Sequence, residues 1–129
     1  EFDLVPALKD YYTRHLADGT FVSWLAMDGE EIVGTSGMSF VEKPPYFGCP
    51  SGKIGLLSSM YTLDEYRRKG IALKTLDLLV EDAKAKGITA ISLEATDIGK
   101  PLYEKYGFEF YGILKDVDAQ DSRVYKKDL

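Results

Sequence analysis

The feature that most constrains this chain is a basic turn containing glycine, YRRKGIA at residues 66–72, set between an apolar segment and an amphipathic helix. The segment 54–63, IGLLSSMYTL, is mostly apolar, with Ser and Thr as its small hydroxyl residues. It is long enough to form a largely buried strand. After the turn, apolar residues recur at helical spacing until Gly87 ends the helix. This order of strand, turn and helix predicts an α/β fold. The predicted buried stripe of the helix consists of Ala72, Leu73, Leu76, Leu79, Val80 and Ala83.

The same turn predicts an anion site of the nucleotide or coenzyme type. The first N–H groups of a helix have no intrahelical partner and lie at the positive end of the macrodipole, so a bound polyphosphate gains several hydrogen bonds. Gly70 lets the phosphates approach without a side chain in the way. Arg67, Arg68 and Lys69 oppose the dipole unless an anion joins them. The alternative is a solvated charge cluster with Gly70 as a tolerated glycine.

Length and composition indicate one globular domain over residues 1–129, with 45% hydrophobic and 29% charged residues. No apolar run reaches the roughly 18 residues of a membrane span, and no signal peptide is visible at Glu1, although the start is open to truncation. The net charge of −5 argues against a nucleic-acid partner, whose phosphates need a basic face. We therefore expect neither nucleic acid nor membrane as a partner.

One cysteine, Cys49, and one histidine, His15, restrict the chemistry further. They exclude an intrachain disulfide and leave a Cys/His zinc site without enough ligands, so no metal is expected. Reducing, cytoplasmic surroundings suit this cysteine usage. His15 falls in a surface helix, 6–17, and Cys49 in a turn-rich loop, so neither is favoured as a catalytic residue.

The remaining elements predict a sheet that mixes antiparallel and parallel pairs. The loop 42–53 contains three prolines and two glycines, and it is either functional or a flexible surface excursion. The other expected elements are a strand at 20–27, a hairpin turn at 28–30, a strand at 31–41, a strand at 88–95, a short helix at 99–106, a strand at 108–114 and a last strand at 122–126.

Two motifs in residues 61–108 resemble the GNAT superfamily of acyl-CoA-dependent N-acyltransferases. RRKGIA at 67–72 is similar to its coenzyme A pyrophosphate signature, R/Q-x-x-G-x-G/A, with Ala72 in place of the commoner Gly. LYEKYGF at 102–108 is similar to its second hallmark, LYxxxGF, and the spacing of one helix and one strand also agrees. The hairpin and the first helix agree more weakly.

The resemblance implies a mixed, centrally splayed β-sheet flanked by helices. The strands that end near Thr62 and Ala95 would diverge and leave a wedge for pantetheine, with backbone groups of Met60 and Thr62 offered to its amides. Such folds usually begin with one more strand and helix, so either the N-terminus is incomplete or the first strand is lacking. The implied binding residues for acetyl-CoA, the co-substrate, are Met60, Tyr61, Thr62, Arg67, Arg68, Lys69, Gly70, Ile71, Ala72 and Thr96.

The resemblance also implies an acid and a base for acyl transfer to an amine. Tyr103 matches the usual general acid, which protonates the departing thiolate; the alternative is a packing tyrosine. The strand before the turn has no carboxylate, so Glu94 of SLEA is the expected base, against the alternative of an exposed strand residue. Thr96 stands where many members have Asn, and the link from Glu94 to Tyr103 is shorter than in peptide acetyltransferases. The substrate class therefore does not transfer.

We expect an N-acetyltransferase in which a small-molecule or peptide amine attacks acetyl-CoA directly in a ternary complex. The first helix, the loop 42–53 and the last hairpin would select the acceptor, with Tyr46, Phe47 and Tyr111 either lining an amine pocket or packing on the core. A homodimer is compatible with the sequence, which does not fix the oligomeric state. The alternative function is a non-catalytic acyl-CoA-binding sensor or interaction module, which would keep 67–72 but not need Glu94 and Tyr103.

Overall fold

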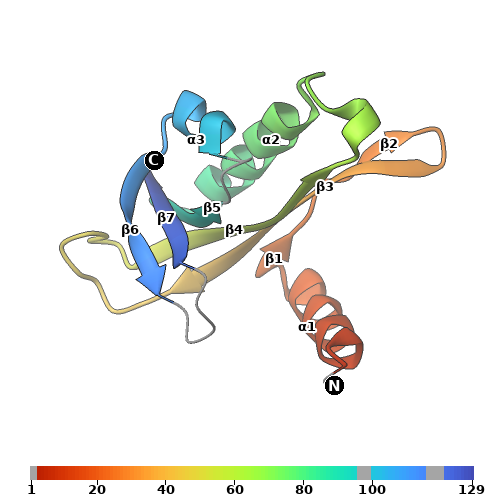
Figure 1. Ribbon diagram of the computed structural model, residues 1–129. Helices are drawn as coiled ribbons and strands as arrows, with labels where there is room; N and C mark the ends of the chain where they lie inside the picture. The colour runs from red at the N-terminus through yellow and green to blue at the C-terminus, as the bar shows by residue number, and fades with distance from the viewer. Residues whose placement is uncertain (1–2, 96–99, 116–120) are drawn as a thin grey trace.

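The computed structural model describes residues 3–95, 100–115 and 121–129 of the chain. Its described residues form one mixed sheet with helices on both faces (Figure 1). The helices are α1 (Val5–Asp18), the 3₁₀ turn η1 (Asp64–Tyr66), α2 (Ile71–Ala85) and α3 (Lys100–Tyr106). The strands are β1 (Phe21–Val22), β2 (Ala26–Asp28), β3 (Glu31–Glu42), β4 (Lys53–Thr62), β5 (Ala90–Ala95), β6 (Glu109–Lys115) and β7 (Asp121–Asp128).

The strand order is β1-β3-β4-β5-β7-β6, with β2 paired to β3 beside this path. The β4–β5 pair is parallel, and every other pair between the described strands is antiparallel. The parallel pair requires a crossover, which α2 supplies. The expected mixed α/β sheet is thus confirmed, and β4 and β5 are its central neighbours.

The predicted strand 20–27 is wrong in its middle, because the structure divides it into β1 and β2. The hydroxyl of Ser36 on β3 accepts a hydrogen bond from the Trp24 N–H at 3.2 Å and donates one to the Trp24 carbonyl at 2.9 Å. Ser23 also donates, through Oγ, to the Ser36 carbonyl at 2.6 Å. Since a side chain satisfies the backbone of Trp24, the strand ladder is interrupted there.

The helix α2 packs its apolar stripe on the sheet, as predicted for most of its residues. Leu73 is the exception, being 40% exposed, whereas Thr75 is buried in its place and donates to the Ala72 carbonyl at 3.0 Å. Leu73 lies at the edge of the stripe and in the first turn, so it passes beyond the sheet. The buried residues of α2 are Thr75, Leu76, Leu79, Val80 and Ala83.

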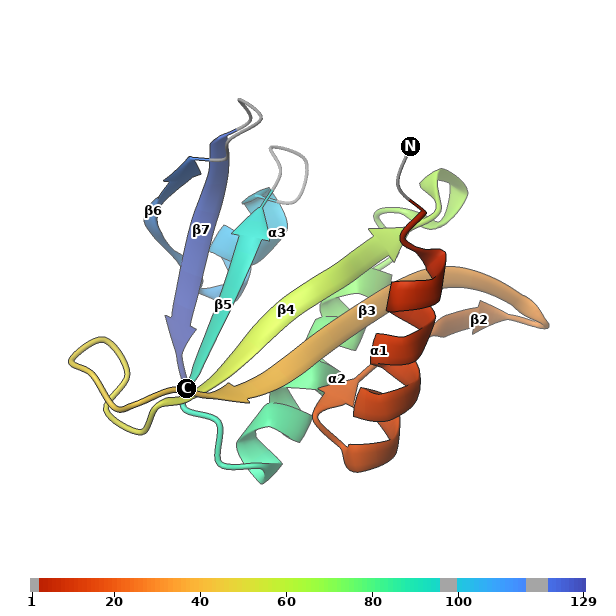
Figure 2. The same cartoon turned by 90° about the horizontal axis from the view of Figure 1, so that it is seen from below.

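The strand β4 is buried on the face that meets α2, but only at its start on the opposite face, which corrects the expectation of a largely buried strand. Leu57 is buried against α2, and Ile54 is buried on the opposite face beside Cys49. Farther along that opposite face, Leu56 is 39% and Tyr61 55% exposed. The helices α2 and α3 lie on one face of the sheet, and α1 lies on the other face, over β3 (Figures 1 and 2). Part of β4 on the α1 face is therefore left open.

The helix α1 is anchored at its C-terminal half, where the predicted stop at Gly19 is confirmed by a left-handed φ of 78°. Tyr11 shares a 2.7 Å hydrogen bond with Ser39 of β3 and stacks on His15 at 4.2 Å between ring centroids. Leu4 and Leu8, nearer its start, remain 56% and 46% exposed. Among the described residues, no helix is long and apolar enough to cross a membrane.

Candidate functional site

The parallel strands β4 and β5 separate along most of their length. They pair at only three positions, Ile54 with Ala90, Gly55 with Ile91 and Leu56 with Ser92. Beyond these pairs, β4 continues to Thr62 against β3, and β5 continues to Ala95 against β7. In the part of the chain that the structure describes, the two facing edges diverge without pairing (Figure 2). We call these edges, residues 57–62 and 93–95, the splay, and its presence confirms the predicted fold.

A β-bulge bends β4 inside the splay. Ser58 pairs with Gly37 and Tyr61 with Thr35, so β4 has one residue more than β3 between these pairs. Ser59 adopts a left-handed φ of 57°, and its carbonyl accepts a 2.7 Å hydrogen bond from Oγ1 of Thr35. Bulges increase the local twist and leave a residue outside the ladder. This one turns β4 away from β5 at the half-buried Met60.

The turn after β4 ends at a helix N-terminus that is open. Gly70 is the N-cap of α2, with a left-handed φ of 81°, and the described residues give this end no side-chain cap. The first turn of α2 contains no acidic residue, and a Cβ at Gly70 would meet nothing within 4 Å. The carbonyl of Gly70 already accepts the Lys74 N–H at 3.0 Å. The N–H groups of residues 71–73, which precede the first intrahelical donor, are thus available to an anion.

The three basic residues of the turn have different surroundings. Arg67 is engaged: Nε donates to the Thr62 carbonyl at 3.0 Å, and the guanidinium pairs with Asp64 at 2.7 Å. Arg68 is exposed in a left-handed conformation with φ 63°, and the Lys69 ammonium lies 5.3 Å from the centroid of the Tyr66 ring. Arg67 therefore folds the turn back on the end of β4, while Arg68 and Lys69 add positive charge near the open amides. Their predicted role in binding stays a prediction.

Tyr66 attaches this turn to the hairpin between β2 and β3. Its hydroxyl donates to the carboxylate of Asp28 at 2.5 Å. This hydrogen bond, with the nearby negative charges, raises the pKa of Tyr66 to about 12.

Tyr106 makes a similar contact between α3 and α2. Its hydroxyl donates to Asp77 at 2.7 Å, and burial together with that hydrogen bond raises the pKa of Tyr106 to about 12.

We expect an alkaline titration to show late-ionising tyrosines, with Tyr66 and Tyr106 among them. A hydrogen bond that raises a folded-state pKa stabilises the fold below pH about 10, and this contribution is lost as the pH rises through about 12. Ultraviolet absorbance should therefore show most tyrosines ionising before these two, and Tyr66→Phe and Tyr106→Phe should each remove one late step. A single common step near pH about 10 would contradict these contacts.

Tyr103, the predicted acid, lies in α3 with a buried ring and only 7% exposure. The ring meets Phe108 edge-on, 5.9 Å between centroids. In residues 3–95, 100–115 and 121–129 its hydroxyl has no hydrogen-bond partner, yet no buried polar side-chain atom there lacks one, so the hydroxyl reaches the protein surface. Burial raises the pKa of Tyr103 above its usual value. A phenol that stays protonated and meets solvent with its tip can donate a proton.

Three predicted residues have side chains outside the part of the chain that the structure describes. The backbone of Glu94 pairs with Val124 in β5 and β7, but its side chain, like that of Tyr111, lies outside what the structure describes. Thr96 lies outside the described residues altogether.

The two aromatic residues of the loop between β3 and β4 are exposed. Tyr46 is 43% exposed and Phe47 is fully exposed, so Phe47 does not pack on the core. Among the described residues, no group of His, Cys, Asp and Glu is arranged to hold a metal ion.

Sequence reasoning missed the residues that shape this site from a distance. Asp28 holds the turn, Thr35 holds the bulge, and Gly34 lets α2 approach, since a Cβ there would lie 2.9 Å from Ile71. Gly34 carried a signal, because a glycine inside a strand often marks a close approach. Asp28 and Thr35 carried none, since their partners are 38 and 24 residues away in the sequence.

Comparisons with known proteins agree on one family. Residues 2–108 match the model of the Acetyltransferase (GNAT) family. The chain is 25% identical over 107 residues to the uncharacterized N-acetyltransferase YsnE of Bacillus subtilis (strain 168), covering 79% of this chain and 65% of that protein. It is 31% identical over 109 residues to N-acetyltransferase 8B of Rattus norvegicus, covering 81% of this chain and 47% of that protein. The chain thus spans about half to two thirds of these relatives.

A solved structure supports the same assignment. The crystal structure of a predicted acetyltransferase with acetyl-CoA from Clostridium acetobutylicum shares the fold with a TM-score of 0.80 and 34% identity. The match covers 93% of this chain and 74% of that one.

Proposed function

Because this chain belongs to the acetyltransferase (GNAT) family, we propose that it transfers an acetyl group from acetyl-CoA to the amine of an acceptor. One observation carries the proposal: the open N-terminus of α2 follows directly on the end of β4 that lines the splay. One elongated ligand could place a diphosphate at the N-terminus of α2 and an extended chain along the end of β4. The acetyl-CoA named for the Clostridium acetobutylicum structure has this shape.

The residues present fit this co-substrate. The N–H groups of residues 71–73 would hold the pyrophosphate, with Arg68 and Lys69 adding charge and Gly70 leaving space. The unpaired edge of β4 at Met60 and Thr62 would meet the pantetheine amides, as strand edges meet extended ligands. The Thr62 carbonyl now accepts Nε of Arg67, so binding there would compete with that contact. When bound, the co-substrate supplies an acetyl carbon activated as a thioester.

Tyr103 would hold the proton that the departing thiolate takes. Its raised pKa keeps the phenol protonated at neutral pH, and the hydroxyl has no competing partner among the described residues. Tyr103 would donate this proton to the sulfur as negative charge develops on it in the breaking carbon–sulfur bond. Glu94 would take the proton from the amine, directly or through water, by the resemblance of SLEA to the strand that carries the base in peptide acetyltransferases.

Direct attack by the amine is favoured over an acylated enzyme. The single cysteine, Cys49, is 1% exposed and sits at the closed end of the splay, next to Ile54 and Ala90. A buried thiol away from the unpaired edges is badly placed to receive an acyl group. A ternary complex, with the acceptor approaching from the open part of the α1 face, needs no such intermediate. The free thiol also suits the cytoplasm.

The test is an assay of free-thiol release from acetyl-CoA with polyamines, amino acids, aminoglycosides and peptide N-termini as acceptors. Calorimetric titration with coenzyme A accompanies it. We expect binding of coenzyme A and turnover with at least one amine class. Binding without any turnover would support the non-catalytic sensor instead, and absence of binding would refute both functions.

A further inference from the structure

Few strand pairings join the two halves of the sheet on either side of the splay. One half contains β1 to β4, the other β5, β7 and β6, and only the three β4–β5 pairs connect them within the sheet that the structure describes. The paired segments 54–56 and 90–92 form the closed end of the splay, from which β4 and β5 diverge. Any contact that fixes their relative orientation also fixes how far the unpaired edges stand apart.

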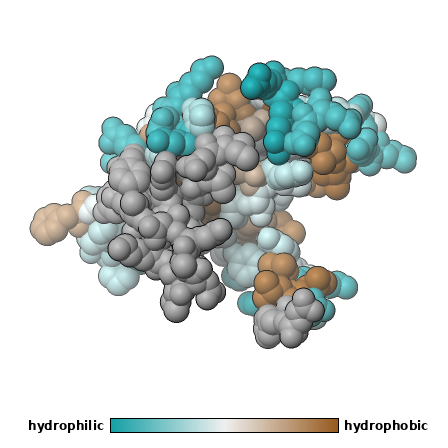
Figure 3. All heavy atoms as spheres, viewed as in Figure 1, coloured by the Kyte–Doolittle hydropathy of each residue, from teal (hydrophilic) through white to brown (hydrophobic). Residues whose placement is uncertain are grey.

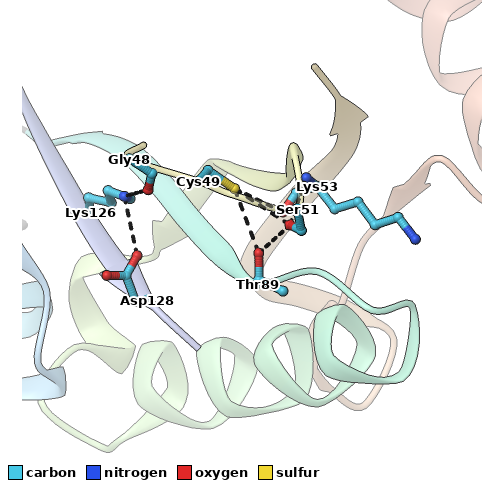
Figure 4. Close-up of polar contacts among 7 residues, drawn as sticks. All are labelled: Gly48, Cys49, Ser51, Lys53, Thr89, Lys126 and Asp128. Atoms are coloured by element: carbon cyan, nitrogen blue, oxygen red, sulfur yellow. Dashed lines mark hydrogen bonds and ion pairs between the residues drawn. The ribbon is translucent and has the colours of Figure 1, made fainter. Parts of the chain in front are cut away.

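Such a contact lies at this closed end, where Cys49 and Ser51 meet Thr89 (Figure 4). Oγ of Ser51 and Oγ1 of Thr89 are 2.5 Å apart, and each is 3.6 Å from the Cys49 sulfur. Cys49 and Ser51 belong to the loop that precedes β4, whereas Thr89 immediately precedes β5. We call these three residues the hydroxyl–thiol cluster. It crosses from one half of the sheet to the other.

Backbone bonds and packing align the cluster with both strands. Oγ of Ser51 accepts the Lys53 N–H at 3.0 Å, and the Lys53 carbonyl accepts the Thr89 N–H at 3.2 Å. Cys49 packs with Ile54 of β4 and Ala90 of β5. The cluster is thus built into the first residues of both strands, immediately before their three pairs.

A second tie joins the same loop to β7. The Lys126 ammonium donates to the Gly48 carbonyl and pairs with Asp128 at 3.2 Å (Figure 4).

The polar surroundings of the Cys49 thiol also affect its pKa. Burial raises this pKa, but hydrogen bonds with Thr89, Ser51 and the Gly52 backbone outweigh burial, so the net pKa is lowered. The sulfur thus contacts both hydroxyls and the Lys53 carbonyl, and the loop is fixed to both halves.

We propose that Ser51, Thr89 and Cys49 are positioning residues that set the separation of β4 and β5 and thereby the fit of the coenzyme in the splay. This inference rests on the proposed function. Hydrogen bonds are directional, so this cluster restricts the angle between the strands in a way that apolar contact alone does not. None of the three residues lines the unpaired edges, so their effect passes through strand geometry.

The test uses the double variant Ser51→Ala, Thr89→Val, which removes both hydroxyls at once. Replacing both partners of a hydrogen bond by apolar groups is close to neutral for stability. The Lys53 N–H, which loses Ser51 as its acceptor, is exposed and can bond to water instead. The urea midpoint should therefore stay near that of the unaltered protein. The Kd for coenzyme A should nevertheless rise about fivefold, and amides of residues 54–56 and 90–92 should exchange hydrogen faster. Thr89→Ser, which keeps the hydroxyl, should behave like the unaltered protein.

Ser36→Ala is the matched control. Ser36 is buried and bonds Trp24 entirely within one half of the sheet, so this variant should lose stability while keeping its affinity for coenzyme A. The inference is overturned if the double variant binds coenzyme A within about twofold of the unaltered protein, or if exchange at the paired segments is unchanged. Failure of the unaltered protein to bind coenzyme A refutes the proposed function, and the exchange measurement still decides whether the cluster holds the two halves together.

Discussion

Gly70→Asp is expected to raise the Kd for coenzyme A about 100-fold while the protein stays folded. A Cβ at Gly70 meets nothing within 4 Å, and Asp tolerates left-handed φ better than most residues. Its carboxylate would sit at the N-cap of α2 and accept the N–H groups that the pyrophosphate needs. Bringing like charges together at a binding site costs several kcal/mol. A 100-fold rise in Kd corresponds to a loss of about 2.7 kcal/mol in binding free energy, which is within this range. Calorimetric titration measures it.

Gly70→Asn separates charge from shape. Asn has nearly the same size and also tolerates the left-handed conformation, but it carries no charge. Its Kd should lie much closer to that of the unaltered protein, and the difference between the two variants should shrink at high salt. Equal binding by Gly70→Asp and the unaltered protein would mean that no anion binds at this helix end.

Tyr103→Phe is expected to lower kcat about 100-fold, the usual contribution of a general acid, and to leave the Kd for coenzyme A unchanged. The ring keeps its edge-on contact with Phe108, so the fold should persist. Because burial raises the pKa of Tyr103, activity that depends on the protonated phenol should persist to a higher pH than an ordinary tyrosine would allow. Steady-state assays over a pH series measure both effects.

Tyr106→Phe is the natural control for this substitution. It removes a hydroxyl from the same helix, but that hydroxyl is already bonded to Asp77 on α2. Its kcat should stay close to that of the unaltered protein. Equal losses in the two variants would point to a role of α3 in folding and would remove Tyr103 from the chemistry.

The sequence was most informative where a local signal decides the structure. Gly19 and Gly87 end their helices in left-handed conformations, with φ of 78° and 75°, as the spacing of apolar residues and glycines predicted. The buried Ile91 and Leu93 alternate with Ser92, and the crossover through α2 makes β4 and β5 parallel. Each of these features depends on residues within a few positions of one another or on one topological rule.

Features fixed by distant partners escaped prediction. The break between β1 and β2 depends on Ser36, and the bulge at Ser59 depends on Thr35. The exposure of Leu73 depends on where the sheet ends beneath α2, which helical periodicity does not encode. The splay itself was expected only from the family resemblance, because no local pattern says that a parallel pair stops after three residues.

The division of the sheet also has a consequence for how this protein is made. The half that contains β1 to β4 is continuous in the chain, and β5 follows only after the whole of α2. A chain emerging from the ribosome therefore presents β4 as an edge strand with unpaired backbone groups until residues 90–95 arrive. Such edges recruit other chains. The lag in translation between these strands is thus the interval in which a nascent chain is most exposed to aggregation.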